Sequence, residues 1–568
     1  MAKIFKLEIN NFRGIKKFSY TFNNPELDNA NLICLVGRGD TGKTTILKAI
    51  SYALYPNWNL QFYDTDFYNC DINNPIEITV TLVDIPEKLL TEDKYGLYIR
   101  GINKKTKIIK DEIEDDDIKA LTIKLKVQKD LEPEWQVVNN RANSPKKISH
   151  IDRSMLNAFM ISDYIDSHFY WRRNSPLYSL LKSTVNIEEF KEGSNLLIDV
   201  TREVQNNMDA YSFKKFNKAV EIIQSNAGQL GVKIPKLSNS TDFKDIYIKE
   251  GRISLHENKI PLRLKGKGNK RLISIAIQME LVKNGGIVLI DEIEQGLEPD
   301  RVKHLVRMLY KINKGQIFIT THSQNVIEEI EAEEIFLISN KNGLMEAKAS
   351  NKNFQDIMRA CPEAAYAKKV IACEGKTEIG ICRALDNFRI NNDENSMSEL
   401  GIVYTYGSGD DSFKRADKLN KLGLITCVLC DSDKDETKSK KEEASNSGID
   451  IFDWDKGNCI EQQVFFDLPW EAIKELIDYR ISISSEESIK DSVKSKYTGG
   501  EFPDNWKEND SLELREALMQ ASISKKKEWF KRIDHGEFLG TIIFKYFEQI
   551  KNKKLGKTLK ELSKWIDK

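Results

Sequence analysis

Eight residues that follow a short apolar run have the types and spacing of a phosphate-binding loop. The apolar run is residues 32–36, and residues 37–44 read G-x-x-x-x-G-K-T before a helical pattern. Gly37 and Gly42 allow backbone N–H groups to turn toward an anion. Lys43 can then reach the β- and γ-phosphates, and the Thr44 hydroxyl can hold a magnesium ion. We therefore expect a bound nucleoside triphosphate; a purely structural turn is the alternative.

A second apolar run, residues 287–290, ends in Asp291 and Glu292, as in the Walker B segment of an ATPase. We expect Asp291 to hold the magnesium ion through water or Thr44, and Glu292 to polarise the water that attacks the γ-phosphate. The next run, residues 316–321, ends at His322, which we interpret as a γ-phosphate sensor; an ordinary surface or core histidine is the alternative. The predicted nucleotide-binding residues are Gly37, Gly39, Asp40, Thr41, Gly42, Lys43, Thr44, Thr45 and Asp291.

Two apolar runs in the C-terminal part of the chain also end in carboxylates. Residues 369–373 precede Glu374 and, one helical turn later, Glu378; residues 424–430 precede Asp431 and Asp433. Oxygen ligands at the ends of neighbouring strands suit magnesium or manganese, and two such ions can stabilise both the attacking and the leaving oxygen of a phosphodiester. We therefore expect a metal site here; acid-rich surface loops are the alternative.

Alternating apolar residues predict a mixed sheet around the nucleotide. The alternation covers Phe5 to Ile9, then residues 18–22, then residues 76–82, and it places the first part of an ATPase domain at residues 1–153. The spacing then becomes helical, for example at Leu197 and Val200 with Val204 and Met208.

We interpret residues 154–235 as a helical insertion within that domain. It would pack against a partner subunit or cover its own sheet. Strand patterns return at residues 246–248 and 253–255, so that residues 236–350 complete the ATPase domain.

Length and composition restrict the class of protein. A chain of 568 residues exceeds what one hydrophobic core usually serves, so three or more structural units are expected. Because the net charge is −1, nucleic-acid binding must rely on local basic patches. No stretch reads as a bilayer span or a signal peptide, and the eight cysteines are scattered as in reduced proteins, so we expect a cytoplasmic protein without a membrane partner.

The phosphate loop, the Walker B segment and His322 together resemble the ATP-binding-cassette (ABC-type) ATPases of the SMC, RecF and Rad50 kind. In that family, a segment with serine and glycine precedes Walker B by one helix and completes the site of the opposite subunit. Residues 265–271 occupy the matching place with Gly268 and Arg271, but a lysine replaces the usual serine. The five basic residues from Arg263 to Arg271 either contact phosphate or face solvent. The resemblance implies an α/β fold with an inserted helical dimerisation segment, in a homodimer or a higher homo-oligomer.

The paired acids at the two C-terminal strand ends resemble the Toprim domain of topoisomerases, primases and a group of nucleases. An ABC-type ATPase followed by a Toprim α/β domain, here residues 363–568 with a C-terminal helical extension, resembles the OLD (overcoming lysogenization defect) family of ATP-dependent endonucleases. That likeness implies as metal ligands Glu374, Glu378, Asp431, Asp433 and Glu461. It implies that Lys527 or Lys531 stabilises the transition state.

The same likeness implies an ATP-regulated, metal-dependent DNA endonuclease that uses ATP and Mg²⁺, with Mn²⁺ as an alternative at the Toprim site. The family includes solitary members, the Gabija nuclease with its helicase-like partner, and retron-associated effectors that work with a reverse transcriptase and its nucleic acid. Antiphage defence is therefore the implied setting. The other hypothesis is an SMC- or RecF-like ATPase clamp or scaffold whose Toprim-like half binds DNA or a partner without cleaving. A topoisomerase or primase is disfavoured, because zinc-ligand spacing is absent from the sequence.

Overall fold

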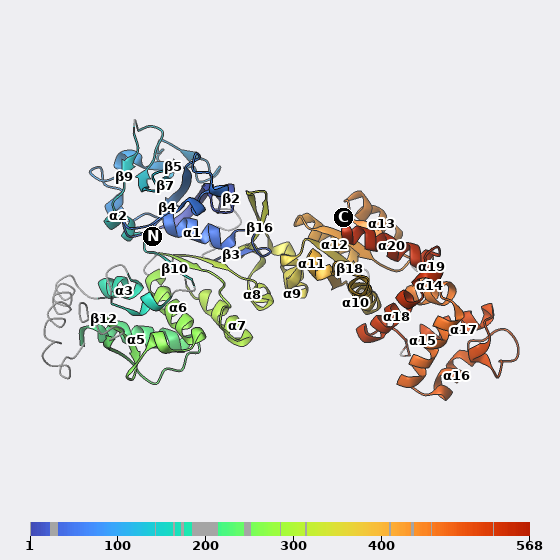
Figure 1. The fold of residues 1–568 in the computed structure, drawn as a ribbon. Coiled ribbons are helices and arrows are strands. Elements are labelled where there is room, and N and C mark those ends of the chain that lie inside the picture. Colours follow the sequence, from blue (N-terminus) through green and yellow to red (C-terminus); the bar gives the residue numbers. More distant parts are fainter. Residues whose placement is uncertain are drawn as a thin grey trace. The chain divides into compact units, whose positions relative to one another are not determined.

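The chain forms two compact units, Met1–Gln355 and Asp356–Lys568 (Figure 1). The computed structural model describes residues 2–22, 32–142, 144–162, 165–171, 175–184, 214–242, 252–283, 286–312, 315–407, 411–432, 437–455, 457–525 and 527–568. No helix in these ranges is long and apolar enough to cross a membrane.

One large sheet dominates the first unit. Its described strands follow the order β10-β14-β15-β3-β16-β17-β2-β1-β4-β7-β5-β6, with β8 and β9 attached through β7. Five neighbouring strands are parallel: β10 (Ala158–Ile161), β14 (Ile287–Ile290), β15 (Gln316–Thr320), β3 (Leu32–Val36) and β16 (Ile335–Lys341). The other strands are β17 (Leu344–Ala349), β2 (Ile15–Thr21), β1 (Lys3–Phe12), β4 (Ile76–Val83), β7 (Ile118–Val127), β5 (Arg100–Ile102), β6 (Ile109–Lys110), β8 (Pro133–Val137) and β9 (Lys146–Lys147).

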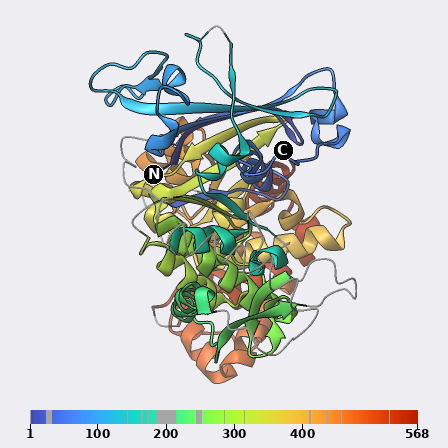
Figure 2. The same cartoon turned by 90° about the vertical axis from the view of Figure 1, so that its left-hand side faces the viewer.

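The burial of these strands explains their sequences. Every residue of β3, β14 and β15 is buried, as continuous apolar runs require in a parallel sheet covered on both faces. Strands β1 and β4 pair antiparallel and alternate more strongly between buried and partly exposed residues. Figure 2 shows the long antiparallel strands, coloured blue to cyan, running across the top of this unit. The predicted strands that lie within the described residues of this unit are therefore confirmed.

The helices described in the first unit lie between its strands along the chain. They are α1 (Lys43–Ala53), α2 (His150–Ser154), α3 (Pro176–Thr184), α5 (Lys214–Gln229), α6 (Lys267–Lys283), α7 (Pro299–Leu309) and α8 (Gln324–Glu329). A small antiparallel sheet contains β11 (Leu237–Asp242), β12 (Arg252–Glu257) and β13 (Ile260–Pro261). Helix α7 buries Val302, Leu305, Val306 and Leu309, whose spacing places them on one helical face.

The expected helical insertion is only partly helical. Residues 158–161 form β10, which pairs in parallel with β14 at the edge of the main sheet, so the prediction of helix from residue 154 is wrong here. The run Ala-Phe-Met-Ile is apolar without a distinguishing period, and its strand partner lies more than a hundred residues later in the chain. Helix α5 packs against α6 of its own unit, and Asn226 Nδ2 donates to Glu280 Oε2 over 2.9 Å. The predicted helix positions from Leu197 to Met208, and the strand at residues 246–248, lie outside the described residues.

The second unit is built on a four-stranded parallel sheet in the order β19-β18-β20-β21. Its strands are β19 (Ile402–Tyr406), β18 (Lys369–Cys373), β20 (Ile425–Leu429) and β21 (Asp450–Phe452). Its helices are α9 (Gln355–Ala360), α10 (Lys376–Asn391), α11 (Met397–Leu400), α12 (Asp411–Lys421), α13 (Thr437–Asn446), α14 (Ile460–Asp467), α15 (Trp470–Ile483), α16 (Glu486–Lys494), α17 (Leu512–Ser522), α18 (Ile533–Lys545), α19 (Phe547–Ile550) and α20 (Lys554–Asp567). The unit begins at Asp356, ahead of the predicted boundary at residue 363, because Ile357 and Cys361 pack against Val370 of β18.

Helices α10 and α18 approach each other closely in the second unit. A Cβ added at Gly380 of α10 would lie 2.3 Å from the backbone nitrogen of Glu537, and one at Gly540 of α18 would lie 2.5 Å from the Cβ of Ala384. Real Cβ atoms do not come this close, so both positions require glycine. The contact fixes α10, which carries Glu378, against the segment that follows Lys531.

Candidate nucleotide and metal sites

The phosphate loop lies between the end of β3 and the start of α1. Gly42 precedes α1 with φ +92°, a backbone conformation that favours glycine. A Cβ at Gly37 would lie 2.5 Å from the Ile338 carbonyl oxygen, so the loop can pass β16 only with glycine there. Thr41 Oγ1 closes the loop by donating to the Arg38 carbonyl over 2.9 Å. Gly39 and Asp40 are exposed at the tip, and Thr45 lies in the first turn of α1.

Lys43 points back into its own loop. Its Nζ donates to the carbonyl oxygens of Gly37 and Arg38, each over 2.7 Å. Burial lowers the pKa of this lysine to about 8, although Asp291 and Glu292 oppose the shift. The ammonium group is therefore held where a loop of this kind binds phosphate, in surroundings that favour an added anion.

The Walker B acids lie near the phosphate loop because β14 and β3 are parallel and are separated only by β15, so that both strands end at the same edge of the sheet. Ile290 of β14 pairs with Ile319, and Ile319 pairs with Cys34 of β3. Asp291 follows β14 directly at this edge of the sheet.

Two hydroxyl groups fix the Asp291 carboxylate. Its Oδ1 accepts from Thr44 Oγ1 over 2.9 Å and from Thr320 Oγ1 over 2.7 Å. The Glu292 N–H donates to the same Thr320 hydroxyl over 2.7 Å, and Glu292 has φ +48°. Thr44 and Asp291 supply the hydroxyl and carboxylate oxygens that magnesium requires, so they are the residues that would hold it.

Glu294 was not predicted from the sequence, although it lies only two residues beyond Glu292. One of its oxygens accepts from Thr321 Oγ1 over 2.8 Å, and the other accepts from the His322 N–H over 2.5 Å. The carboxylate therefore links the Walker B turn to the turn that carries His322. The His322 side chain is exposed at the carboxyl end of β15, the sheet edge where we expected it.

The segment that resembles the signature of ABC-type ATPases contacts its own Walker B turn. Arg271 is buried, and its guanidinium donates to the carbonyl oxygens of Asp291 and Glu292 and to Gln295 Oε1. A Cβ at Gly268 would lie 2.3 Å from the Gly296 carbonyl oxygen. Arg271 is therefore committed within its own subunit, which the prediction of phosphate contact did not anticipate.

The other basic residues of this segment are in part also occupied. Lys265 pairs with Glu257 over 2.7 Å, and Lys270 pairs with Asp166 over 2.9 Å.

In the second unit, Glu374 and Asp431 come together at the carboxyl end of the parallel sheet. Glu374 Oε2 accepts the Asp431 N–H over 2.9 Å. Asp431 Oδ1 accepts from Trp454 Nε1 over 3.1 Å and from the Ile460 N–H over 2.9 Å. The orientation of Asp431 is thus set by three neighbouring segments of the chain.

Glu378 and Glu461, which are both buried, form an acidic cluster with the buried Asp431 and the half-buried Glu374. Burial raises the pKa of Glu378 to about 7, with Glu461 and Glu374 adding to the shift. Burial, followed by the charges of Glu378 and Glu461, also raises the pKa of Asp431 above its ordinary value. Both carboxylate oxygens of Glu461 are buried and accept no hydrogen bond. The cluster therefore concentrates negative charge that few protein donors compensate.

Lys531 is the cation beside this cluster. Its Nζ lies 3.7 Å from Glu461 Oε1. Burial alone would lower the pKa of Lys531, but the carboxylates of Glu461, Glu378 and Asp431 outweigh it and raise that pKa above its ordinary value.

The donor chemistry of the cluster fits a divalent cation. Buried carboxylates with unused oxygens, as at Glu461, are the ligands that magnesium and manganese prefer. In the part of the chain that the structure describes, no three histidine, cysteine, aspartate or glutamate side chains are close enough to hold a metal ion as they stand. Asp433, the fifth predicted ligand, lies outside the described residues.

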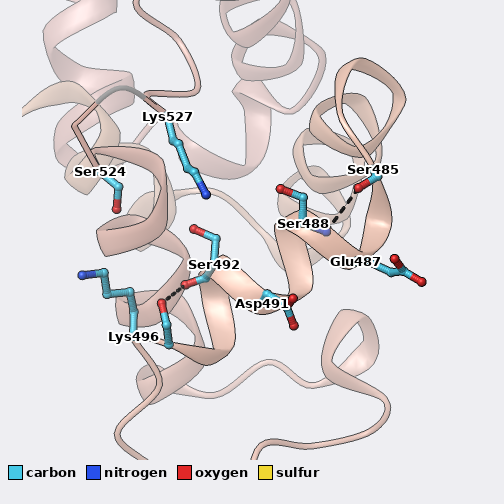
Figure 3. Close-up of a pocket in the computed structure, with 9 residues that line it drawn as sticks. Ser485, Glu487, Ser488, Asp491, Ser492, Lys496, Ser524 and Lys527 are labelled. Atoms are coloured by element: carbon cyan, nitrogen blue, oxygen red, sulfur yellow. Dashed lines mark hydrogen bonds between the residues drawn. The ribbon is translucent and has the colours of Figure 1, made fainter.

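Lys527 lies away from these acids. It lines a polar cavity of about 580 Å³ between α16 and the segment after α17, together with several serines and Lys496. Figure 3 shows the Lys527 side chain extending toward Ser488 and Ser492 of α16. Of the two lysines that the family resemblance offered, only Lys531 adjoins the acidic cluster.

The chain belongs to the AAA ATPase domain family, which matches residues 3–327 and therefore more than half of the sequence. The match begins in β1 and ends in α8, so it includes the phosphate loop, the Walker B acids and His322, and it stops before the second unit. A comparison with curated proteins found no match.

Several solved structures are similar to this chain. A Smc head bound to the C-winged helix domain of ScpA has 15% identity and a TM-score of 0.38, covering 61% of this chain and 96% of that one. A Smc head domain with an extended coiled coil, bound to a ScpA domain derived from Pyrococcus furiosus, has 15% identity and a TM-score of 0.38, with 63% and 99% covered. The recombination mediator protein RecF has 12% identity and a TM-score of 0.35, with 61% and 98% covered.

Proposed function

We propose that this protein is an ATP-regulated, metal-dependent DNA endonuclease of the OLD kind, with an ABC-type ATPase in the first unit and a Toprim nuclease in the second. The observation that carries the proposal is the buried acidic cluster at the ends of β18 and β20, with Lys531 beside it. Buried acids with strongly perturbed pKa values at the carboxyl ends of parallel strands are typical of functional sites.

The protein groups of the second unit have distinct roles in this proposal. Glu374, Glu378, Asp431, Glu461 and Asp433 would hold Mg²⁺ or Mn²⁺, which supplies charge neutralisation for the attacking and leaving oxygens of a phosphodiester. Lys531 donates hydrogen bonds to the negative charge that develops at the scissile phosphate. Trp454 and the Ile460 N–H keep the Asp431 carboxylate oriented, so that it would be in place for the cation.

The first unit binds and hydrolyses ATP in the same proposal. Lys43 and the loop amides would hold the phosphates, and Thr44 and Asp291 would hold magnesium. Glu292 orients and deprotonates the attacking water, and Glu294 holds the turn from which His322 reports the γ-phosphate.

The proposed setting is antiphage defence in the cytoplasm, in a homodimer or higher homo-oligomer. A helicase-like protein, or a retron reverse transcriptase with its nucleic acid, is the proposed kind of partner. These assignments rest on the family resemblance, and DNA is the proposed substrate.

Cleavage of supercoiled plasmid in Mg²⁺ and in Mn²⁺ tests the nuclease activity, with EDTA as the control. Nicked or linear product is expected only with metal. The alternative function is an SMC- or RecF-like clamp or scaffold that binds DNA or a partner without cleaving it. One observation favours that alternative: the described acids do not form a ready metal-ligand cluster. Intact plasmid in the presence of DNA binding would select the clamp.

Regulation by ATP is tested separately. Cleavage by the wild type, Lys43→Ala and His322→Ala is measured across ATP concentrations at fixed free magnesium, because ATP chelates the metal. A ligand with different affinities for two conformations shifts their populations, so cleavage by the wild type should change with ATP and cleavage by Lys43→Ala should not. Cleavage by the wild type that stays constant from zero to saturating ATP, with any required partner present, contradicts regulation.

A further inference from the structure

Lys441 holds the backbone of the turn that carries Asp431. It lies in α13, and its Nζ donates to the Asp431 carbonyl oxygen over 3.0 Å, to Ser432 Oγ over 2.9 Å and to Asp453 Oδ2 over 2.9 Å. Its side chain is 16% exposed. An ammonium group has three donors, and here all three meet oxygens of the protein.

Asp453, the third partner of Lys441, is itself anchored. Lys554 Nζ lies 3.4 Å from Asp453 Oδ1, and Thr558 Oγ1 donates to the Asp453 carbonyl over 2.9 Å. Both residues belong to α20, which packs against β21 and α14. Through Asp453, Lys441 therefore contacts a well-packed part of the second unit.

The turn is also held at its other edge. The Ser432 N–H donates to the Asn458 carbonyl oxygen over 2.9 Å, and the Gly457 N–H donates to the Ser432 carbonyl oxygen over 2.9 Å. With the Asp431 side chain bound by Trp454 and the Ile460 N–H, the Asp431 carbonyl and the Ser432 hydroxyl point toward Lys441. Lys441 is thus the side chain that secures this edge of the turn.

We propose that Lys441 is a positioning residue for the metal site of the second unit. This inference rests on the proposed function and adds a role that concerns how the site is built. In this role Lys441 contacts neither substrate nor metal; it fixes the backbone from which Asp431 projects. Outer-shell partners of metal ligands typically change metal affinity or activity about 10- to 100-fold when they are removed.

Because Lys441 is positively charged, an experiment can distinguish its positioning role from a purely electrostatic effect on metal binding. A cation beside a metal site repels the metal, so its removal alone would tighten metal binding. Loss of positioning instead weakens binding, because Asp431 must be ordered again when the ion enters. The two explanations therefore predict opposite signs for the same substitution.

Terbium luminescence provides a readout that is independent of cleavage. Trp454 Nε1 lies 3.1 Å from Asp431 Oδ1, so indole excitation should sensitise Tb³⁺ bound by that carboxylate. Tb³⁺ alone is titrated into the full-length, nucleotide-free protein, and Mg²⁺ or Mn²⁺ then competes it away. Asp431→Ala defines the signal that belongs to this site.

The test compares Lys441→Met, Lys441→Gln and Lys441→Arg with Lys438→Met, a matched change at an exposed position of the same helix. Lys441→Met is expected to weaken Tb³⁺ binding about tenfold or more. Lys441→Arg should recover most of the affinity, and Lys438→Met should match the wild type. Lys441→Gln keeps hydrogen-bond donors and a side chain of similar size, so it replaces Lys441→Met in the test if the methionine variant does not fold. The same direction of effect on Tb³⁺ binding is expected.

Unchanged or tighter Tb³⁺ binding by folded Lys441→Met or Lys441→Gln overturns the positioning role. Failure of the proposed function gives a different result: the wild type shows the Asp431-dependent signal but leaves plasmid intact. If cleavage is present, the Lys441 variants should lower kcat at saturating DNA while KM for DNA changes little, because the positioning role involves no contact between Lys441 and DNA.

Discussion

The two units present acids at the ends of parallel strands in opposite ways. In the first unit, Asp291 and Glu294 accept hydrogen bonds from threonine hydroxyls and a backbone amide. In the second unit, Glu461 is buried with no hydrogen bond to either oxygen, and the pKa of Glu378 is raised to about 7. Both acids compared in the first unit therefore have protein donors, whereas in the second unit Asp431 has them and Glu461 does not.

This difference separates the two kinds of chemistry. Burying an uncompensated carboxylate is costly unless a cation or a proton balances it. The first unit avoids that cost through its threonines, so its acids are oriented before nucleotide arrives. In the second unit Lys531 is a partial counter-charge, and the raised pKa of Glu378 shows that protonation can balance part of the remaining charge.

Among the substitutions that test this comparison, removal of the Asp431 carboxylate should have the largest effect on DNA cleavage. Asp431→Ala deletes a predicted metal ligand, and loss of several kcal/mol of transition-state stabilisation should reduce DNA cleavage about a thousandfold or more. ATP hydrolysis by the first unit should remain, since it uses separate residues. Plasmid nicking and phosphate release measure the two activities. Asp478→Ala, at an exposed position of α15, is the control, and nicking at the wild-type rate by Asp431→Ala would eliminate this site.

The corresponding change in the first unit is Glu292→Gln. A glutamine keeps the size of the side chain but cannot accept the proton of the attacking water, so hydrolysis should fall about a hundredfold or more. ATP binding should persist, because Lys43 and the loop amides are intact. Single-turnover hydrolysis and equilibrium nucleotide binding separate the two effects, with Asp300→Asn in α7 as the control. Normal turnover would identify another residue as the base.

Lys531 and Lys527 allow a comparison of two lysines within the second unit. Lys531→Ala removes the counter-charge beside Glu461, and DNA cleavage should fall about 10- to 100-fold. Lys527→Ala alters a side chain that faces the α16 cavity and serves as the matched variant, with cleavage expected within about threefold of the wild type. Cleavage rates at saturating metal measure both. The reverse ranking would transfer the catalytic role to Lys527.

A buried histidine of the first unit, His168, allows a test with a smaller expected effect. The quantity tested is the pH dependence of stability. His168 Nδ1 lies 2.6 Å from Ser274 Oγ, and burial lowers its pKa to about 4. The unfolded chain, with an ordinary pKa of about 6.5, binds the proton more readily between these values, so stability is complete above pH 6.5 and falls as the pH drops toward 4. The loss from pH 7 to pH 5 should be about 2 kcal/mol.

His168→Gln keeps a polar partner for Ser274 and removes this proton uptake. Urea denaturation with hydrogen exchange in α6 measures the stability of the unit at both pH values. An equal loss of stability between pH 7 and pH 5 in the variant and the wild type would show that His168 is not the source.

Much of the fold was predictable because the strands that carry chemistry are short apolar runs ending at distinctive residues. The runs before Gly37, Asp291, Glu374 and Asp431 all proved to be strands of parallel sheets. Parallel strand order then brings their carboxyl ends together without any further signal. The presence of Glu374 beside Asp431 follows from this rule alone.

The unpredicted parts depend on contacts between distant segments. Strand β10 has no distinguishing period, and Arg271 gives no sign in the sequence that it binds the Walker B carbonyls. Glu294 and Lys441 are ordinary charged residues until folding places particular donors and acceptors beside them. Hydrogen bonds of this kind are specific to the tertiary structure, and a single sequence contains no pattern that identifies them.

The order of synthesis along the second unit has a consequence for the cell that makes this protein. The acids of the cluster lie between residues 374 and 461, but their cation comes from Lys531, and Asp453 is anchored by helix α20 at residues 554–567. A growing chain on the ribosome therefore carries the acids before it can bring Lys531 and α20 to them. Under the proposed nuclease function, a chain that ends before residue 531 would have the acids of the active centre without their cation, and one that ends before α20 would lack the anchor of Asp453.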